Sequence, residues 1–411
     1  MKNVRDVIAV LLASTTALCA ADESASRMLA LTPEAASRLD KAQRAGVIEI
    51  APVHLPGPDA GPCDHFGWPI ATMSGDTLVV IHRRIPGHDH REGDKPDSSL
   101  AYGIVLRSED GGKTWSKPYD LRDCMKPEDR DRGGFVPLLQ RAKWDTGNPD
   151  KRGYKVVMHA IGTTRDGAVV SVNPHGVFRS EDQGRTWKHF PAALREDTLA
   201  HKGLNPGPGI FDDPDCGLLV FGSGDASSFT FPVFASGDGG ATWRVEDFPV
   251  GFFQAEPAAV LHDGRYLVVT RDQTTRRSHK QMTWRPGQKP QIIDTNLEDP
   301  RMVDTVDFCF NPVTQRLEIV RSERHRMELW VWSMAPADWE KGQWARECRL
   351  LGREGVFFKT ADGFHPAGAV IDAQRGVQHI FVYSGHPYGP AGVFRITRTL
   401  NTPRLREALA K

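Results

Sequence analysis

The sequence has no excess of either charge. Its 411 residues include 52 Lys and Arg and 52 Asp and Glu, so the formal net charge is zero. A chain without a net field has no general attraction to nucleic acid or to an anionic membrane surface. Any electrostatic function must therefore come from charged side chains that gather locally.

Cysteine is scarce, and long apolar runs are absent. None of the six cysteines belongs to a C-x-x-C pair, which argues against a metal site, and no motif indicates a cofactor. The five cysteines beyond Cys19 are scattered, which favours buried thiols. The apolar run at residues 7–12 is too short to span a bilayer.

The first twenty residues have the features of an export signal. Lys2 and Arg5 precede the apolar run, and small residues lead to Ala20. Leu18 stands where lipoprotein processing wants a small residue, which argues against lipidation of Cys19. We therefore expect residues 1–20 to be a signal peptide and the mature protein to be secreted or periplasmic.

One eight-residue pattern, S-x-D-x-G-x-T-W, occurs at residues 108–115, 180–187 and 236–243. Its Ser and Asp oxygens can accept hydrogen bonds from the N–H groups of a tight turn, and its Gly can take a positive φ. Its Trp can bury a large ring beneath that turn. Repeats at this spacing favour a propeller or a solenoid.

A second repeat is a short apolar strand, a polar turn and a stronger β-branched strand, as expected of a hairpin. The six instances lie at residues 69–81, 159–172, 209–221, 256–270, 306–320 and 367–382. Further strands follow each pair. Six units of four strands match the blades of a propeller.

The eight-residue pattern is the Asp box, and most of residues 64–400 resembles the sialidase-like (BNR/Asp-box repeat) β-propeller family. We therefore predict an all-β fold, a six-bladed β-propeller with Asp-box turns, over residues 51–400. Residues 21–50 are expected to form an N-terminal extension with a short helix between Thr32 and Ala45. Residues 401–411 are expected to form a C-terminal tail, which can include a second short helix.

In a propeller the first strands of the blades surround the axis, and the loops at one end form the binding site. Each blade presents residues where its first strand begins and its second ends. The expected ring is His65 with Arg83 and Arg84, His159 with Asn173, Asn205 with Asp225, Glu256 with Arg271, Asp307 with Arg321, and His365 with Tyr383.

The family resemblance implies roles for several of these residues. Sialidases bind the substrate carboxylate with three arginines, and a Glu activates their Tyr nucleophile. Glu256 and Arg271 have the family's spacing across one hairpin. Arg84 is a second candidate, and one of Arg321, Arg324 and Arg326 is the third.

The family's acid Asp lies a few residues beyond an arginine that leaves the first blade. Asp89, after Arg84, fits this placement, although a solvated loop residue would look the same. His88 and His90 beside it have no remote partner at metal-ligand spacing, so no metal site is expected.

The sequence departs from the family at two positions. Gly67 stands where the first carboxylate-binding Arg belongs, and His365 stands where the Tyr nucleophile belongs. The predicted catalytic set is therefore Asp89, Glu256 and His365. The predicted substrate-binding set is Arg84, Arg271, Arg321, Arg326, His65, His159 and Tyr383.

Several arginines beside carboxylates and histidines suit a negatively charged sugar and acid–base chemistry. The leading hypothesis is an exo-acting glycoside hydrolase that releases a terminal sialic or uronic acid from extracellular glycans. A uronate polysaccharide lyase, with His65, His159, His365 or Tyr383 abstracting a proton, is a second hypothesis. A non-catalytic glycan-binding propeller is a third, because Asp boxes are structural.

Overall fold

The computed structural model describes residues 48–57, 64–85, 102–127, 159–173, 176–190, 206–224, 229–323, 325–326, 328–351, 368–385 and 390–400. The regular secondary structure of this part of the chain is almost all β-strand, with short 3-10 helices at Leu121–Cys124 and Pro336–Lys341. No helix within these ranges is long and apolar enough to cross a membrane. The signal peptide, the helix expected before residue 46 and the C-terminal tail lie outside the described residues.

The strands form antiparallel groups that follow one another along the chain. The first three groups are β2 (His65–Ser74), β3 (Thr77–Ile85), β4 (Tyr102–Ser108) and β5 (Tyr119–Asp120); β6 (Ala160–Thr163), β7 (Val169–Asn173), β8 (Gly176–Ser180) and β9 (Lys188–Phe190); and β10 (Pro206–Asp213), β11 (Gly217–Gly222), β12 (Thr230–Ser236) and β13 (Arg244–Pro249).

The chain continues with further groups of the same kind. They are β14 (Gln254–His262), β15 (Arg265–Asp272), β16 (Ser278–Trp284) and β17 (Gln291–Glu298); β18 (Val306–Asn311), β19 (Arg316–Glu323), β20 (Glu328–Met334) and β21 (Ala345–Leu351); and β22 (Gly368–Asp372), β23 (Val377–Gly385) and β24 (Ala391–Thr399), to which β1 (Ile48–His54) is added.

The first two strands of every group pair as the hairpin that the sequence predicts. The turn residues supply the required conformations. Asp263 and Gly264, for example, join β14 to β15 with φ of 50° and 67°. Positive φ at both central residues suits the right-handed twist of the paired strands.

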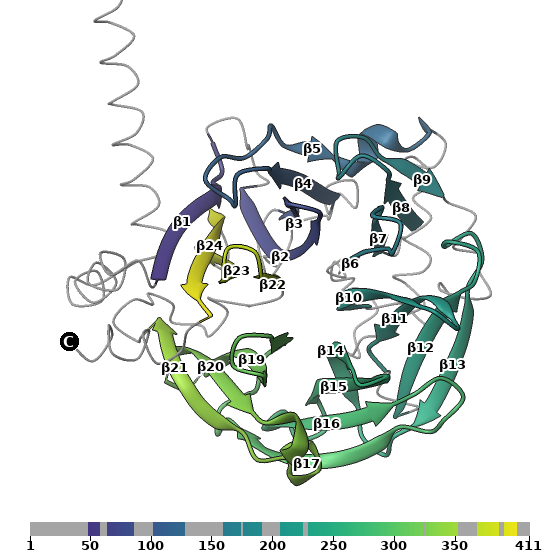
Figure 1. The fold of residues 1–411 in the computed structure, drawn as a ribbon, viewed down its shortest axis with the longest axis vertical. Coiled ribbons are helices and arrows are strands. Elements are labelled where there is room, and N and C mark those ends of the chain that lie inside the picture. The colour runs from purple at the N-terminus through teal and green to yellow at the C-terminus, as the bar shows by residue number, and fades with distance from the viewer. Residues whose placement is uncertain are drawn as a thin grey trace, which may run out of the picture.

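The first strands of the groups contact one another in series: β2 with β6, β6 with β10, β10 with β14, β14 with β18, β18 with β22, and β22 with β2. The sheets radiate from a common centre, and β2, β6, β10, β14 and β22 lie nearest to it (Figure 1). This is the arrangement of a β-propeller.

The N-terminal strand closes this ring. β1 runs antiparallel to β24, from Ile48 opposite Arg398 to His54 opposite Val393. The predicted boundary at residue 50 falls within this strand, and the sequence patterns did not predict the strand. The last sheet therefore combines β22, β23 and β24 from the C-terminal part with one strand from the N-terminal part (Figure 1).

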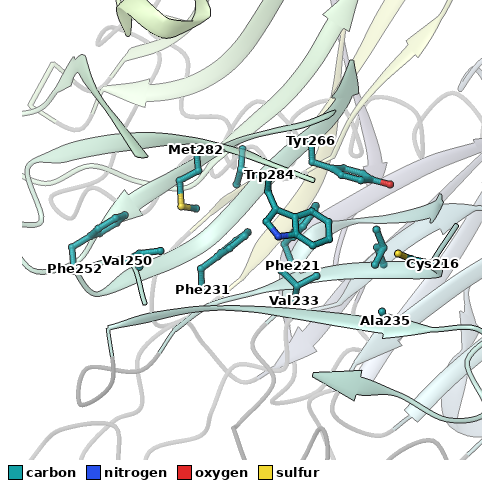
Figure 2. Close-up of a cluster of buried hydrophobic side chains, with 12 residues drawn as sticks. Cys216, Phe221, Phe231, Val233, Ala235, Val250, Phe252, Tyr266, Met282 and Trp284 are labelled. Carbon is teal, nitrogen blue, oxygen red and sulfur yellow. The ribbon is translucent and has the colours of Figure 1, made fainter. Parts of the chain in front are cut away.

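Apolar side chains fill the spaces between neighbouring groups. Between β10–β13 and β14–β17, Phe221 stacks on Phe231 with ring centroids 5.5 Å apart and meets Tyr266 and Trp284 edge to face (Figure 2). Such pairs contribute about 0.5–1.5 kcal/mol each beyond the area they bury. The four cysteines in the described ranges are free thiols, and all except Cys124 are buried.

The three S-x-D-x-G-x-T-W segments form the same turn between the third and fourth strands of their groups. In the second, Ser180 Oγ accepts from Gly184 N at 2.7 Å, and Asp182 Oδ1 accepts from Thr186 N at 2.8 Å. Trp187 and Trp243 are buried under their turns, whereas Trp115 is only half-buried.

Two of these turns also connect neighbouring groups. Arg107 on β4 donates to the carbonyl of Gln183 at 2.7 Å, and Arg395 on β24 donates to the carbonyl of Gly111 at 2.5 Å. The two carbonyls occupy equivalent places in their turns. The turns therefore lie toward the outer strands, where they join sheet to sheet.

Candidate functional site

The hairpin geometry brings chemically active residues to one end of the ring. Where a first strand begins, the second strand of the same group ends, as Gly67 opposite Arg83 and Ala255 opposite Arg271 show. Because the first strands contact in series, these ends gather around the centre. We call Trp68, Arg83, Glu256, Arg271 and Tyr383 the inner-end cluster.

Glu256 and Arg271 form an ion pair within this cluster. Arg271 Nη1 donates to Glu256 Oε2 at 2.5 Å, and Thr305 Oγ1 donates to the same oxygen. Ser223 Oγ accepts from the backbone N–H of Glu256 at 2.8 Å. Both charged side chains are largely buried. Glu256 is therefore a carboxylate held in one orientation from three neighbouring elements.

Asp304 lies beside this ion pair, close to Arg271. Its carboxylate is fully buried, and its Oδ1 lies 3.9 Å from Arg271 Nη1 and accepts from Thr305 N at 2.9 Å. His279 binds the Asp304 carbonyl at 2.7 Å. Burial, with Arg321 and Arg271 nearby, lowers the pKa of His279 to about 3, so its imidazole is neutral near pH 7.

Arg83, Trp68 and Tyr383 form a stack in the same cluster. The Arg83 guanidinium carbon lies 3.5 Å from the centroid of a Trp68 ring. Trp68 also stacks on Tyr383, with centroids 5.0 Å apart. A desolvated cation–π contact of this kind contributes about 2 kcal/mol.

The guanidinium of Arg83 is fully buried, and none of its three nitrogens has a hydrogen-bond partner in the described part of the chain. Burial lowers the pKa of Arg83 well below its usual value, and nearby Tyr383 and Glu256 oppose this effect. A buried charge without hydrogen bonds costs several kcal/mol. The side chain is therefore suited to receive an anionic group from outside.

Arg84 has different neighbours. It lowers the pKa values of His54 and His82, after the larger effect of burial on each. Successive residues on a strand point to opposite faces. The described interactions associate Arg83 with Glu256 and Tyr383, and Arg84 with His54 and His82.

Arg321 and Arg326 have different environments. Arg321 is buried, and its Nη2 donates to the carbonyl of Glu298 at 2.6 Å. Burial lowers the pKa of Arg321 to about 10, although Glu323 and Asp299 oppose this. Arg326 is exposed and donates to His325 at 3.1 Å. The buried position favours Arg321 as a binding residue, and Arg324 lies outside the described residues.

The two predicted histidines that the structure describes are both buried. His65 lies edge-on to Tyr383, with centroids 5.6 Å apart, and so adjoins the inner-end cluster. Asn173 Nδ2 lies 3.2 Å from His159 Nδ1. An added Cβ at Gly103 would lie 2.7 Å from the His159 ring, so only glycine admits the histidine there.

Asp307 is buried where β18 begins. It accepts hydrogen bonds from Phe308 N at 2.8 Å and from Ala369 N of β22. Burial raises its pKa to about 7, against the effect of these hydrogen bonds. Its contacts join β18 to β22, which gives it a structural role between the two groups.

The remaining predicted residues, Asp89, His365, Asn205 and Asp225, lie outside the described residues. Within the described ranges, no group of three or more His, Cys, Asp or Glu side chains could hold a metal ion. The arrangement that the structure shows is an oriented carboxylate and three buried arginines, with aromatic rings around them.

Sequence reasoning placed Arg83 in the ring but did not select it as a binding residue. A signal was present. Trp68-Pro69 precedes Arg83 as Glu256-Pro257 precedes Arg271, and the arginine follows the first residue by 15 positions in both cases (83 − 68 and 271 − 256).

Comparison with known proteins supports the fold. No family model matches the chain. Among curated proteins, it is 27% identical over 141 residues to vacuolar protein sorting/targeting protein 10 of Pyricularia oryzae, a match that covers 33% of this chain and 8% of that protein. Because the chain spans so little of this relative, the match carries no statement about activity.

Several solved structures resemble most of the chain, among them the following three. A Dyadobacter fermentans protein of unknown function is 14% identical, with a TM-score of 0.58 and coverage of 85% of this chain and 98% of that one. A variant of NanB sialidase from Streptococcus pneumoniae is 14% identical, with a TM-score of 0.56 and coverage of 86% of this chain and 71% of that one. An α-L-arabinanase from Penicillium chrysogenum is 12% identical, with a TM-score of 0.53 and coverage of 84% of this chain and 97% of that one. Likeness at this identity shows a fold shared with glycoside hydrolases.

Proposed function

We propose that this protein is a secreted, sialidase-like glycoside hydrolase with a six-bladed, Asp-box propeller, and that it releases a terminal acidic sugar from extracellular glycans. The observation that carries the proposal is the inner-end cluster. Arg83, a buried arginine without hydrogen-bond partners among the described residues, lies near an oriented Glu256–Arg271 pair, at the end of the ring where the hairpins converge.

The chemistry follows from charge and geometry. Guanidinium groups bind the sugar carboxylate and fix its orientation. Asp89 gives a proton to the leaving glycosidic oxygen, while Glu256 with His365 takes a proton from the water that attacks the anomeric carbon. Asp89 and His365 enter from the sequence. Glu256 is supported by its contacts with Arg271 and Thr305.

The acidic sugar is sialic acid or a uronic acid. Both carry a carboxylate on a pyranose ring, and the cluster supplies arginines for that group. The sialidase and arabinanase among the structural neighbours act on sugars, which supports carbohydrate as the substrate class.

The test is a screen of the mature protein on aryl glycosides of N-acetylneuraminic acid, glucuronic acid and their neutral counterparts glucose and galactose. Release of the aryl group from an acidic glycoside, and not from the neutral ones, is the expected result. Absorbance of an unsaturated product from uronate polysaccharides would instead identify a lyase. Binding without turnover on every substrate would identify a glycan-binding propeller.

A further inference from the structure

Two hairpins of the ring have the same irregularity at the same place. In β2–β3, Gly67 pairs with Arg83 and Ile70 with Ile81, so an extra residue lies between them on β2. In β14–β15 the pairs are Ala255 with Arg271 and Ala258 with Val269. Both are β-bulges, which redirect side chains at the ends of strands.

The bulged residues are Trp68 and Glu256, and both have unusual backbones. Their φ angles are 49° and 55°, and each precedes a proline. Positive φ is uncommon for residues other than glycine, and a following proline favours extended backbone instead. The two hairpins therefore share one local design, in which Trp68 corresponds to Glu256 and Arg83 corresponds to Arg271.

The chemistry of the two designs differs. Glu256 neutralises Arg271 through a hydrogen bond of 2.5 Å. Trp68 provides a ring face to Arg83 but no acceptor, so the guanidinium is held in place without neutralising its charge. Tyr383 stacks on Trp68 and thereby fixes the ring.

Position 67 supplies no cation, because it is a glycine. A Cβ added there would make ordinary van der Waals contacts, 3.4 Å from the His65 ring and 3.9 Å from Tyr383. The cation of the first hairpin is instead Arg83, on its second strand.

From this correspondence we propose that Arg83 is the receptor for the ligand's carboxylate and that Trp68 is a positioning residue that holds its guanidinium. The inference rests on the proposed function and deepens it, because it assigns the acidic group of the sugar to one residue. The planar fork of Arg83 pairs with both carboxylate oxygens at once. Arg271, already paired with Glu256, is left to orient that carboxylate.

The test is calorimetric titration at pH 7 with N-acetylneuraminic acid, glucuronic acid and the uncharged methyl ester of each. The wild-type protein is expected to bind an acid at least about 10-fold more tightly than its ester, because a charge-assisted pair is lost in the ester. Arg83→Lys should remove most of this preference, since the ammonium lacks the fork. Trp68→Leu should do the same, and Trp68→Phe should retain part of it, because a smaller ring still faces the cation.

The matched controls are Arg285→Lys, at an exposed turn, and Trp187→Phe, under an Asp-box turn; both should bind as the wild type does. Thermal unfolding of each variant shows whether it is folded. If Trp68→Leu is not folded, Trp68→Phe takes its place.

If the affinities for the acid and for the ester fall equally in the folded Trp68 variants, Trp68 is a surface for the sugar and the inference is wrong. If Arg83→Lys keeps the acid preference while the wild type hydrolyses acidic glycosides, the proposed function stands and this inference fails. If the wild type binds neither acid, both fail.

Discussion

His54 on β1 and His82 on β3 share a hydrogen bond of 2.8 Å between Nδ1 and Nε2. The other ring nitrogen of His82, Nδ1, lies 2.9 Å from the carbonyl of Arg83 and must donate to it. His82 Nε2 is then the acceptor, and His54 Nδ1 is the donor. The strand that closes the ring is thus linked to the backbone of Arg83 through two neutral imidazoles.

This link predicts sensitivity to acid. Burial, with a smaller effect of Arg84, lowers the pKa of His54 to about 4, and burial lowers the pKa of His82 well below its usual value. The unfolded chain therefore binds more protons than the native protein below about pH 6.5. The free energy of unfolding is therefore highest above that pH and decreases as the pH falls. The contribution of His54 to this decrease is about 3 kcal/mol between pH 6.5 and 4.

Urea unfolding at pH 7, 6, 5 and 4 measures this loss. The variant His54→Gln keeps a donor for His82 and removes one titrating group, so its free energy of unfolding should fall less steeply. His262→Gln, at a turn beside the exposed Asp263, is the control and should retain the wild-type dependence. Equal slopes for His54→Gln and the wild type would contradict the prediction.

The tryptophans of the S-x-D-x-G-x-T-W turns should differ in importance. Trp187 is 6% exposed and packs with Phe178 and Val169, and its Nε1 donates to Gly184 at 3.1 Å. Trp187→Ala should cost about 3–5 kcal/mol, the usual value for such a cavity. Trp115→Ala should cost less, because that ring is half-buried.

Urea unfolding of both variants checks the order. Specific activity of the folded protein on an acidic glycoside should stay near the wild-type value in both, since the turns lie by the outer strands. A loss of activity without a loss of stability would place these rings at the functional site instead.

A buried ion pair joins the last two groups. Arg398 of β24 donates to Glu318 of β19 and, at 2.6 Å, to Gln378 of β23. Glu318→Gln or Arg398→Met alone should cost about 3–5 kcal/mol, because one buried charge loses its partner. The double variant should cost less than the sum.

A double-mutant cycle from urea unfolding measures this coupling. The exposed pair Lys341–Asp338, with side chains 69% and 44% exposed, is the comparison. Its removal should change the free energy of unfolding by no more than about 1 kcal/mol. Additive single costs at Glu318 and Arg398 would refute the coupling.

Arg271 should tolerate lysine poorly. The substitution keeps the charge but loses the fork that orients Glu256, and we expect kcat/KM on an acidic glycoside to fall about 100-fold. Arg244→Lys on β13, whose side chain is 58% exposed, is the control and should be unaffected. A change confined to stability would make the Glu256–Arg271 pair structural only.

The hairpins were predictable because their signals are local. Alternating apolar residues and turn residues such as Asp263-Gly264 specify a pair within a dozen positions. The strand β1 was not predictable, because its partner β24 is remote in sequence and no local pattern shows the pairing. The contact of Arg83 with Trp68 was not predictable either, because it depends on how two strands pack and not on a local pattern.

The pairing of β1 with β24 has a consequence for the order of folding. Ile48 is among the first described residues to be synthesised, and its partner Arg398 follows about 350 residues later, about 20–70 s at ordinary rates of translation. During that time β1 has no strand to pair with, and the ring stays open. Translation therefore allows the contacts between β1 and β24 to form only after the strands of all the other groups have been synthesised.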